Sequence, residues 1–398
     1  MKVTAIVVTN GVTTYLPMTL EALASQERAP DQVAVFDWSG TDNRAEILKI
    51  WDDTTAESSS STPVFDYFEL AGSNLGAVVR AGLPQLEVES DDQNWLWLLH
   101  DDSPPEPAAL RALRSSVELS PSVAVAGCKQ VGLTGSPLRS VGYTTSRFGR
   151  RLTGIEDGEV DQGQHDHRDD VLAVGTAGML IRADVWEELG GPDRALGPYL
   201  DGQDLSRRAR LAGHRTVVVP EAIVRHDRAS FSLRRAAAPQ ESHAHIAHSR
   251  SHARRAAFYR RRQEFIHFQL VAAPLLLVPF LLLIALGAGL VRALGRIVLK
   301  EPRMISAEIR APLAVWAAPV SLARSRAQAR RSKRLPRRVL RPLQATWREV
   351  YALERDRRQN RAAARRALVI RDELDIAEQA QRATRRRGWL TLTLLAAV

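Results

Sequence analysis

The chain has 398 residues, enough for two or three domains, and a formal net charge of +10. Residues 1–230 hold 21 Lys and Arg against 34 Asp and Glu, whereas residues 231–398 hold 34 against 11. An acidic first part argues against a polyanion-binding surface there, and the single cysteine, Cys128, excludes a disulfide within the chain. Cys128 lies in an apolar stretch, where we expect a small buried side chain.

Residues 1–230 alternate short apolar stretches with stretches typical of helices. This alternation predicts a mostly parallel sheet with right-handed crossovers. Ligands bind at the carboxyl ends of the strands in such sheets, so polar residues that follow strands are the first site candidates. The expected strands are Val3–Thr9, Gln32–Asp37, Val64–Glu69, Trp95–His100, Val123–Cys128 and Leu172–Ile181, and the expected helices are Thr14–Gln26, Asn74–Leu83, Asp184–Leu189 and Leu205–Ala212.

Two adjacent carboxylates, Asp101 and Asp102, follow the most apolar of these strands. The run Trp95–Leu99 is typical of a strand buried on both faces, and Pro104 prevents its continuation. Adjacent carboxylates at the end of such a strand can hold a hard divalent cation, which can in turn hold a diphosphate. A solvated acidic turn is the alternative interpretation.

Five segments of the chain, taken together in their order and spacing, resemble the family 2 glycosyltransferases of GT-A fold. More narrowly, they resemble the large bacterial members whose cytosolic catalytic domain is joined to membrane helices. The resemblance covers residues 1–230 and implies an α/β domain with a Rossmann-like, mostly parallel sheet flanked by helices. The segments are Val3–Gly11, Val33–Gly40, Asn74–Leu83, His100–Asp102, and Asp201–His214 with Pro220–His226 after it.

The resemblance also implies roles for individual residues. Asp102 matches the carboxylate that binds the metal, and His226 matches the histidine that completes the metal shell, with Mn²⁺ or Mg²⁺ as the cofactor. The donor-binding candidates are Thr9, Asp37, Asn74, Gly76 and Asp101. An ordinary turn aspartate remains an alternative for Asp37, and a helix cap remains one for Asn74.

The catalytic carboxylate has two candidates, because the family motif has an acid where this chain has Gly202. An inverting transferase needs a carboxylate that takes the proton of the acceptor hydroxyl, so Asp201 or Asp204 must serve. We favour Asp201, because it precedes a flexible glycine, whereas Asp204 opens a helix and can act there as a helix-end charge. His100 also departs from the family's pattern, which has an acid at that position.

The second part of the chain is predicted to associate with a membrane. No residue between Leu270 and Val291 is charged, and about 20 such residues span a bilayer core. Beside such a span, attraction to anionic lipid explains the basic sequence that follows it better than nucleic-acid binding does. The expected division is a connector at 231–267, a transmembrane helix at 268–292, a basic helical cytoplasmic region at 293–388 with an interfacial or second membrane segment at 304–322, and the start of a truncated membrane helix at 389–398.

The expected function is therefore metal-dependent, inverting transfer of a sugar from a nucleotide-diphosphate sugar. The acceptor would be lipid-linked or a cell-envelope polysaccharide, and the catalytic domain would lie on the cytoplasmic side of the cell membrane. The alternative is a degenerate GT-A domain that binds a nucleotide sugar or a partner without turnover. Gly202 and His100 motivate that alternative.

Overall fold

The computed structural model of the chain describes residues 1–56, 62–134, 137–156, 158–227, 243–360, 362–363 and 366. The chain separates into two units, Met1–Ala345 and Thr346–Val398. In the second unit, residues 347–360 are helical. The segment 389–398 and residues 231–242 of the connector lie outside the described residues, so the expectations placed on them stay untested.

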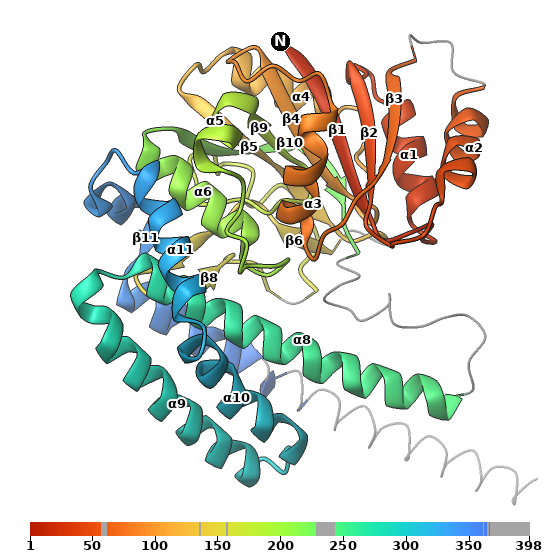
Figure 1. Cartoon of the computed structure of the whole chain (residues 1–398). Helices are drawn as coiled ribbons and strands as arrows, with labels where there is room; N and C mark the ends of the chain where they lie inside the picture. The colour runs from red at the N-terminus through yellow and green to blue at the C-terminus, as the bar shows by residue number, and fades with distance from the viewer. Residues whose placement is uncertain are drawn as a thin grey trace, which may run out of the picture. The chain divides into compact units, whose positions relative to one another are not determined.

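The first unit is built on a mixed sheet with the order β10-β5-β9-β4-β1-β2-β3, with β6 at the side of β5 (Figure 1). The pairs β1–β2, β1–β4, β2–β3 and β5–β10 are parallel, whereas β9 runs antiparallel between β4 and β5. The predicted mostly parallel sheet is confirmed. The strands are β1 Lys2–Thr9, β2 Gln32–Asp37, β3 Val64–Glu69, β4 Asn94–His100, β5 Val123–Val131, β6 Leu138–Ser140, β9 Met179–Arg182 and β10 Arg215–Arg225.

Side chains of the central strands alternate between two apolar cores, one on each face of the sheet. In β1, Val3, Ala5 and Val7 belong to one core, and Ile6 and Val8 belong to the other. The first core contains residues of α1 Leu16–Ala24, α2 Arg44–Thr55 and α4 Ala109–Glu118, and the second those of α3 Leu75–Gly82, α5 Ala183–Leu189 and α6 Asp201–Ala212.

Two elements differ from the sequence prediction in ways that affect the site. The expected strand Leu172–Ile181 is extended in the sheet only from Met179, because Gly178 takes a positive φ of 81° just before it. Helix α6 begins at Asp201 rather than at Leu205, so that both candidate acids lie in its first turn. Gly202 is therefore a helical residue and not a flexible loop residue.

A small second sheet stands beside the main one. It contains β11 Gln344–Ala345, β7 Thr144–Ser146 and β8 Arg151–Leu152, in that order. Residue Tyr143 precedes β7, and Arg151 begins β8. Both residues are thereby placed next to the carboxyl ends of the main strands, where they line the pocket described below.

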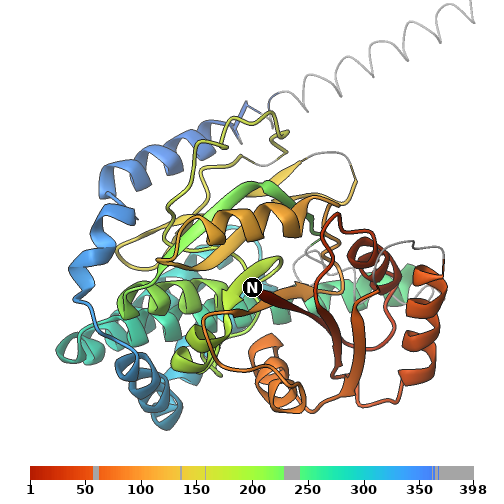
Figure 2. The ribbon, with the colours of Figure 1, turned by 90° about the horizontal axis from the view of Figure 1, so that it is seen from above.

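Among the described residues of the first unit, the helices that follow residue 242 are α8 His243–Ala272, α9 Val278–Val298, α10 Ile305–Trp316 and α11 Pro319–Arg331. In both views, α1 and α2 lie at one end of the main sheet, and α6 and α11 lie at the other (Figures 1 and 2). The transmembrane helix predicted at 268–292 is instead divided between α8 and α9, because α8 ends at Ala272, just before Pro274. Among the described residues, the helix long and apolar enough to cross a membrane covers Leu275–Val298.

Candidate active site

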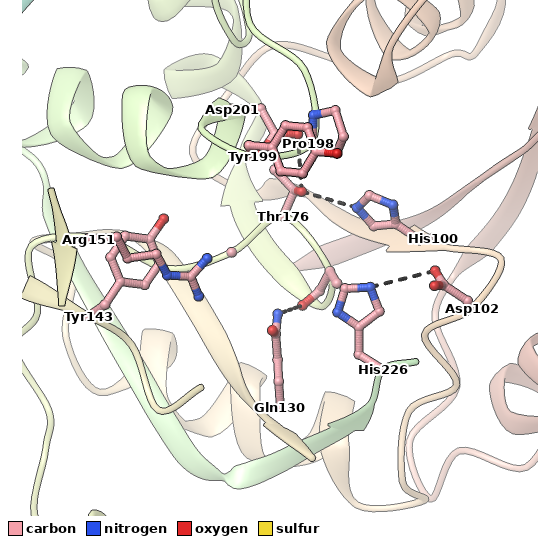
Figure 3. Close-up of a pocket in the computed structure, with 12 residues that line it drawn as sticks. His100, Asp102, Gln130, Tyr143, Arg151, Thr176, Pro198, Tyr199, Asp201 and His226 are labelled. Carbon is pink, nitrogen blue, oxygen red and sulfur yellow. Dashed lines mark hydrogen bonds and ion pairs between the residues drawn. The ribbon is translucent and has the colours of Figure 1, made fainter. Parts of the chain in front are cut away.

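A pocket opens where β4, β5 and β10 end and the first turn of α6 begins (Figure 3). Three of the sequence-predicted site residues, Asp102, Asp201 and His226, line it together. Asp102 follows β4, His226 follows β10, and Asp201 opens α6, so segments far apart in the chain supply them. The full lining is His100, Asp102, Gln130, Tyr143, Arg151, Gly175, Thr176, Ala177, Pro198, Tyr199, Asp201 and His226.

Asp102 and His226 form a buried pair at one side of the pocket. The Nε2 atom of His226 lies 3.6 Å from Oδ1 of Asp102, and the side chains are 12% and 3% exposed. Their backbones are joined as well, since the amide of Asp227 donates to the carbonyl of Asp102. The pairing fixes both side chains at the carboxyl edge of the sheet.

This pair fits a divalent cation in its donor chemistry. Carboxylate oxygen and imidazole nitrogen are ligands of Mn²⁺, and two ligands that each lie about 2.1 Å from one ion are separated by roughly 3 to 4 Å. Nδ1 of His226 is buried without a hydrogen-bond partner within the described part of the chain, which leaves the imidazole tautomer free to adapt. The described residues contain no cluster of three or more such ligands, so a cation here would need further ligands from a diphosphate or water.

On the other side of the pocket, a hydrogen-bonded chain joins His100 to Asp201 through Thr176 (Figure 3). Nε2 of His100 lies 3.1 Å from Oγ1 of Thr176, which donates to Oδ2 of Asp201 at 3.3 Å. A hydroxyl has one proton to donate, so His100 must donate to Thr176 when Thr176 donates to Asp201. The histidine that departs from the family pattern thus orients the hydroxyl beside the candidate base.

Asp201 is a buried carboxyl group, 5% exposed, with few partners. Burial raises its pKa to about 7, although the amide of Gly202, the Thr176 hydroxyl and the charge of Arg151 act in the opposite direction. Its Oδ1 accepts from the Gly202 amide at 2.6 Å. A carboxyl group with such a pKa can release and accept a proton near neutral pH.

Asp204 is directed away from the pocket. Its Oδ2 accepts from Nε and Nη2 of Arg208 at 2.9 and 2.6 Å and from the amide of Asp193 at 3.1 Å. Arg208 also donates to the carbonyls of Leu189 and Gly191, so the ion pair closes the connection between α5 and α6. The geometry therefore gives Asp204 a structural role.

Gly202 is required by close packing. A Cβ atom on this residue would lie 2.5 Å from the carbonyl oxygen of Val174 and 3.1 Å from Cα of Gly175. The first turn of α6 thus packs directly on the 174–176 backbone. No carboxylate fits at position 202 on this backbone, and Asp201 is the acid of this motif that lines the pocket.

Two predicted donor-site residues, Thr9 and Asp37, form a separate network at the ends of β1 and β2. The carboxylate of Asp37 is fully buried and accepts from the amides of Gly11 and Ser39, the amide side chain of Asn43 and the Tyr67 hydroxyl. Thr9 donates to the carbonyl of Gly11 at 2.6 Å. Both residues therefore shape the loop after β1.

Asn74 and Gly76 tie α3 to the segment before α6. The Asn74 side chain caps α3 by accepting from the Ala77 amide, and it donates to the carbonyl of Leu196 at 3.0 Å. A Cβ on Gly76 would lie 3.0 Å from Pro192. Asp101 is also fully buried, and its carboxylate accepts from the Thr13 hydroxyl at 2.7 Å.

Sequence reasoning missed two charged residues at the site. Glu264 of α8 is 6% exposed and accepts from the amides of Gly197 and Tyr199, and burial together with the charge of Asp201 raises its pKa to about 8. Arg151 lies with its guanidinium 4.0 Å above the Tyr143 ring and lines the pocket. Each lies in a charge-rich stretch, and only the fold distinguishes it from its neighbours.

The chain matches the family model described as "Glycosyltransferase like family 2" over residues 2–240. A curated relative, the galactofuranosyltransferase GlfT1 of Mycolicibacterium smegmatis, is 26% identical over 211 residues, which cover 53% of this chain and 66% of the relative. The solved structures that match include the mannosyltransferase PcManGT of Pyrobaculum calidifontis with GDP-Man and Mn²⁺, at 16% identity and a TM-score of 0.40 over 83% of this chain and 85% of that one. Residues 1–349 of S. aureus TarS with UDP-GlcNAc match at 14% identity and a TM-score of 0.42, over 77% and 90%.

Proposed function

The chain belongs to the glycosyltransferase-like family 2, and we propose that it is a metal-dependent, inverting glycosyltransferase of GT-A fold. The observation that carries the proposal is one pocket with two different acidic functions. On one side, Asp102 is paired with a histidine in an arrangement that suits a cation. On the other, Asp201 is buried, separate from that pair, and has a pKa raised to about 7.

In this reaction, Asp201 takes the proton of an acceptor hydroxyl while that oxygen attacks the anomeric carbon of the donor. The new glycosidic bond forms as the bond between the anomeric carbon and the diphosphate oxygen breaks, with inversion at that carbon. Thr176 and the amide of Gly202 hold the carboxylate during this step. General-base catalysis is most effective when the pKa of the base lies near the working pH, as it does for Asp201.

Asp102 and His226 would hold the divalent cation, Mn²⁺ or Mg²⁺. When bound, the cation neutralises the negative charge that develops on the leaving nucleoside diphosphate. Arg151 adds a positive charge to the same pocket and can bind an acceptor oxygen or a phosphate.

The nucleotide part of the donor would lie at the ends of β1 and β2. There, Asp37 and Thr9 hold the backbone of Gly11, and Asp101 accepts a hydrogen bond from the hydroxyl of Thr13 in the same loop. Asn74 and Gly76 would complete the donor site by fixing the segment 192–196. The likeness to a galactofuranosyltransferase makes a nucleotide-diphosphate galactofuranose the first donor to test.

The proposed acceptor is a lipid-linked or cell-envelope polysaccharide presented at the cytoplasmic face of the cell membrane. The apolar helix Leu275–Val298 supports this location, because it directly follows α8, which carries Glu264 next to the pocket loop 197–199. A catalytic domain held at the membrane would reach an acceptor that does not leave the lipid.

The test is transfer by the purified full chain from a panel of nucleotide-diphosphate sugars to membrane-extracted acceptors, with Mn²⁺, with Mg²⁺ and with chelator. Metal-dependent turnover that disappears in Asp201→Asn supports the proposal. Binding of the nucleotide without transfer or donor hydrolysis under any of these conditions would instead establish the degenerate domain that Gly202 and His100 suggest on sequence alone.

A further inference from the structure

Helices α9 and α10 carry an apolar surface that the rest of the described chain leaves uncovered. Within the helix Leu275–Val298, the most apolar stretch of 18 residues has a mean hydropathy of 2.4, and 6% of that stretch is buried. Leu313 and Trp316 of α10 are exposed as well. The exposed apolar side chains of the first helix include Leu276, Phe280, Leu283, Ile284, Leu290, Val291, Leu294, Ile297 and Val298.

The chain enters this helix pair from the catalytic body, which is the α/β part of the chain at residues 1–227. At the end of α8, Phe268 packs with Leu196 and Leu200 of the segment before α6. The carbonyl of Ala273 accepts from Arg326 at 3.0 Å and from Arg337 at 2.9 Å. Leu275 thus begins the apolar helix directly at the catalytic body.

The chain leaves the pair at the same body. In α11, Ser325 donates to Oδ1 of Asp193 at 2.7 Å, and Gln328 donates to the carbonyl of Leu189 at 2.9 Å. Both ends of the segment 274–318 therefore lie on the catalytic side. Such a segment must cross a bilayer an even number of times or not at all.

A return crossing through α10 is excluded by its length and charge. Its 12 residues extend about 18 Å, whereas the hydrocarbon core is about 30 Å thick. It also carries Glu308 and Arg310, which are costly in hydrocarbon, and Pro312 lies within it.

The far end of α9 is itself held next to the catalytic body by a buried ion cluster. Glu308 is fully buried and accepts from Arg292 at 2.9 Å, from Arg296 at 3.4 Å and from Arg262 of α8 at 3.2 Å. Arg262 lies two residues before Glu264, and Glu264 contacts the pocket loop 197–199. A crossing by α9 would break this cluster and leave Glu308 without its partners.

We propose that residues 275–316 form a hairpin that lies in the plane of one leaflet, with its exposed apolar face in lipid, and that α9 does not cross the bilayer. The exposed apolar face contacts a bilayer with anionic headgroups. Lys300 and Arg303 are exposed at the turn of the hairpin and Arg324 is exposed after it, and such basic side chains are attracted to anionic lipid. This proposal deepens the membrane association proposed above and rests on it.

The test adds the full chain to preformed anionic vesicles and measures flotation and thiol labelling. Arg303→Cys, at the turn of the hairpin, is treated with a membrane-impermeant maleimide, and Ser115→Cys on α4 is the matched control. Cys128 is buried and stays unlabelled in the parent chain. We expect flotation and equal labelling of both variants without detergent. Labelling of Arg303→Cys only after detergent would establish a crossing and overturn the proposal.

A second measurement varies the apolar face. Ile284→Glu should lower the vesicle-bound fraction at least tenfold, whereas Leu119→Glu, at an exposed leucine of the catalytic body, should leave it unchanged. Equal losses in both variants would overturn the proposal. If the parent chain does not float and instead forms a concentration-dependent dimer, a second copy of the chain covers the apolar face. That result would overturn both the hairpin proposal and the proposed membrane location. Transfer to an acceptor in detergent would still test the proposed catalytic activity.

Discussion

Asp201 of α6 and Glu264 of α8 are buried carboxyl groups that lie close enough to interact electrostatically. Burial is the main cause of both raised pKa values, about 7 for Asp201 and about 8 for Glu264, and the charge of Asp201 raises the pKa of Glu264 further. At neutral pH, Glu264 therefore keeps its proton while Asp201 is partly ionised. The helix that leads to the apolar hairpin therefore also contributes to the electrostatics of the pocket.

Turnover should rise with pH through about 7. The proposed base must be ionised to accept the proton of the acceptor, and Asp201 loses its own proton near that pH. The acidic limb of kcat against pH, measured in several buffers at saturating donor and metal, checks this. A profile that is flat from pH 5 to 8 would contradict the assignment, since an unperturbed carboxylate is ionised throughout that range.

Glu264→Gln should leave the acidic limb near pH 7. Because the pKa of Glu264 is about 8, its carboxyl group is still protonated and neutral while Asp201 ionises near pH 7. The neutral amide of Gln replaces that neutral carboxyl group, and its oxygen can still accept from the 197–199 backbone. The matched control is Glu221→Gln on β10, an exposed position outside the pocket. A limb that moves to lower pH in Glu264→Gln, with activity retained, would show that Glu264 is ionised while Asp201 titrates and would contradict this order of ionisation.

Asp201→Asn and Asp204→Asn should fail in different ways. Asp201→Asn should lower kcat by roughly 10²- to 10⁴-fold and preserve the fold. Because the pKa of Asp201 is higher in the folded state than in the unfolded chain, its stabilising contribution is present below pH 4 and lost as the pH rises to about 7. Asp201→Asn should therefore be more stable than the parent at pH 8, by up to roughly 4 kcal/mol at about 1.4 kcal/mol per pKa unit.

Asp204→Asn should instead lower stability, because it leaves the buried Arg208 without its carboxylate. Removal of one partner of a buried ion pair costs about 3–5 kcal/mol. Thermal unfolding measured beside kcat distinguishes the two variants. A stable, inactive Asp204→Asn together with an active Asp201→Asn would reverse their assigned roles.

The sequence was sufficient to predict the parallel strands and the order of the site segments, because apolar strand runs and the polar residues after them are local patterns. It also placed Asp102, Asp201 and His226, which the fold brings into one pocket. Glu264 could not be found in this way, since it reaches the site from a helix that follows the catalytic domain. Residues such as this are defined by contacts between distant segments and not by spacing.

The role of Gly202 shows the same limit. In the sequence, Gly202 stands where the family motif has an acid, and the sequence alone predicts a flexible residue before a helix. The structure places it inside the first turn of α6 against the Val174 carbonyl. That contact joins residues 28 positions apart, which no local pattern reports.

Asp102→Ala and His226→Ala should each abolish metal-stimulated turnover and weaken Mn²⁺ binding. The pair supplies the carboxylate and imidazole that suit this ion, and its loss leaves one protein ligand. Binding of Mn²⁺ by the nucleotide-loaded chain, followed by electron paramagnetic resonance, provides a readout besides activity. Asp166→Ala, at a carboxylate outside the pocket, is the control. Undiminished Mn²⁺ binding in both site variants would contradict the metal assignment.

Gly202→Asp, which restores the acid of the family motif, should destabilise the chain and abolish turnover rather than improve it. Its Cβ would approach the Val174 carbonyl to 2.5 Å, so α6 must move away from residues 174–176 and the Thr176–Asp201 hydrogen bond must break. Overpacking of this kind typically costs about 1–3 kcal/mol, and occasionally more.

Gly202→Ala should show most of the same loss of Tm, because the collision begins at Cβ. Gly295→Ala, a helical glycine with open space around its Cβ position, should by contrast be neutral or slightly stabilising. A Gly202→Asp variant with normal Tm and raised kcat would mean that α6 can shift at little cost and that the motif acid, not Asp201, is the better base.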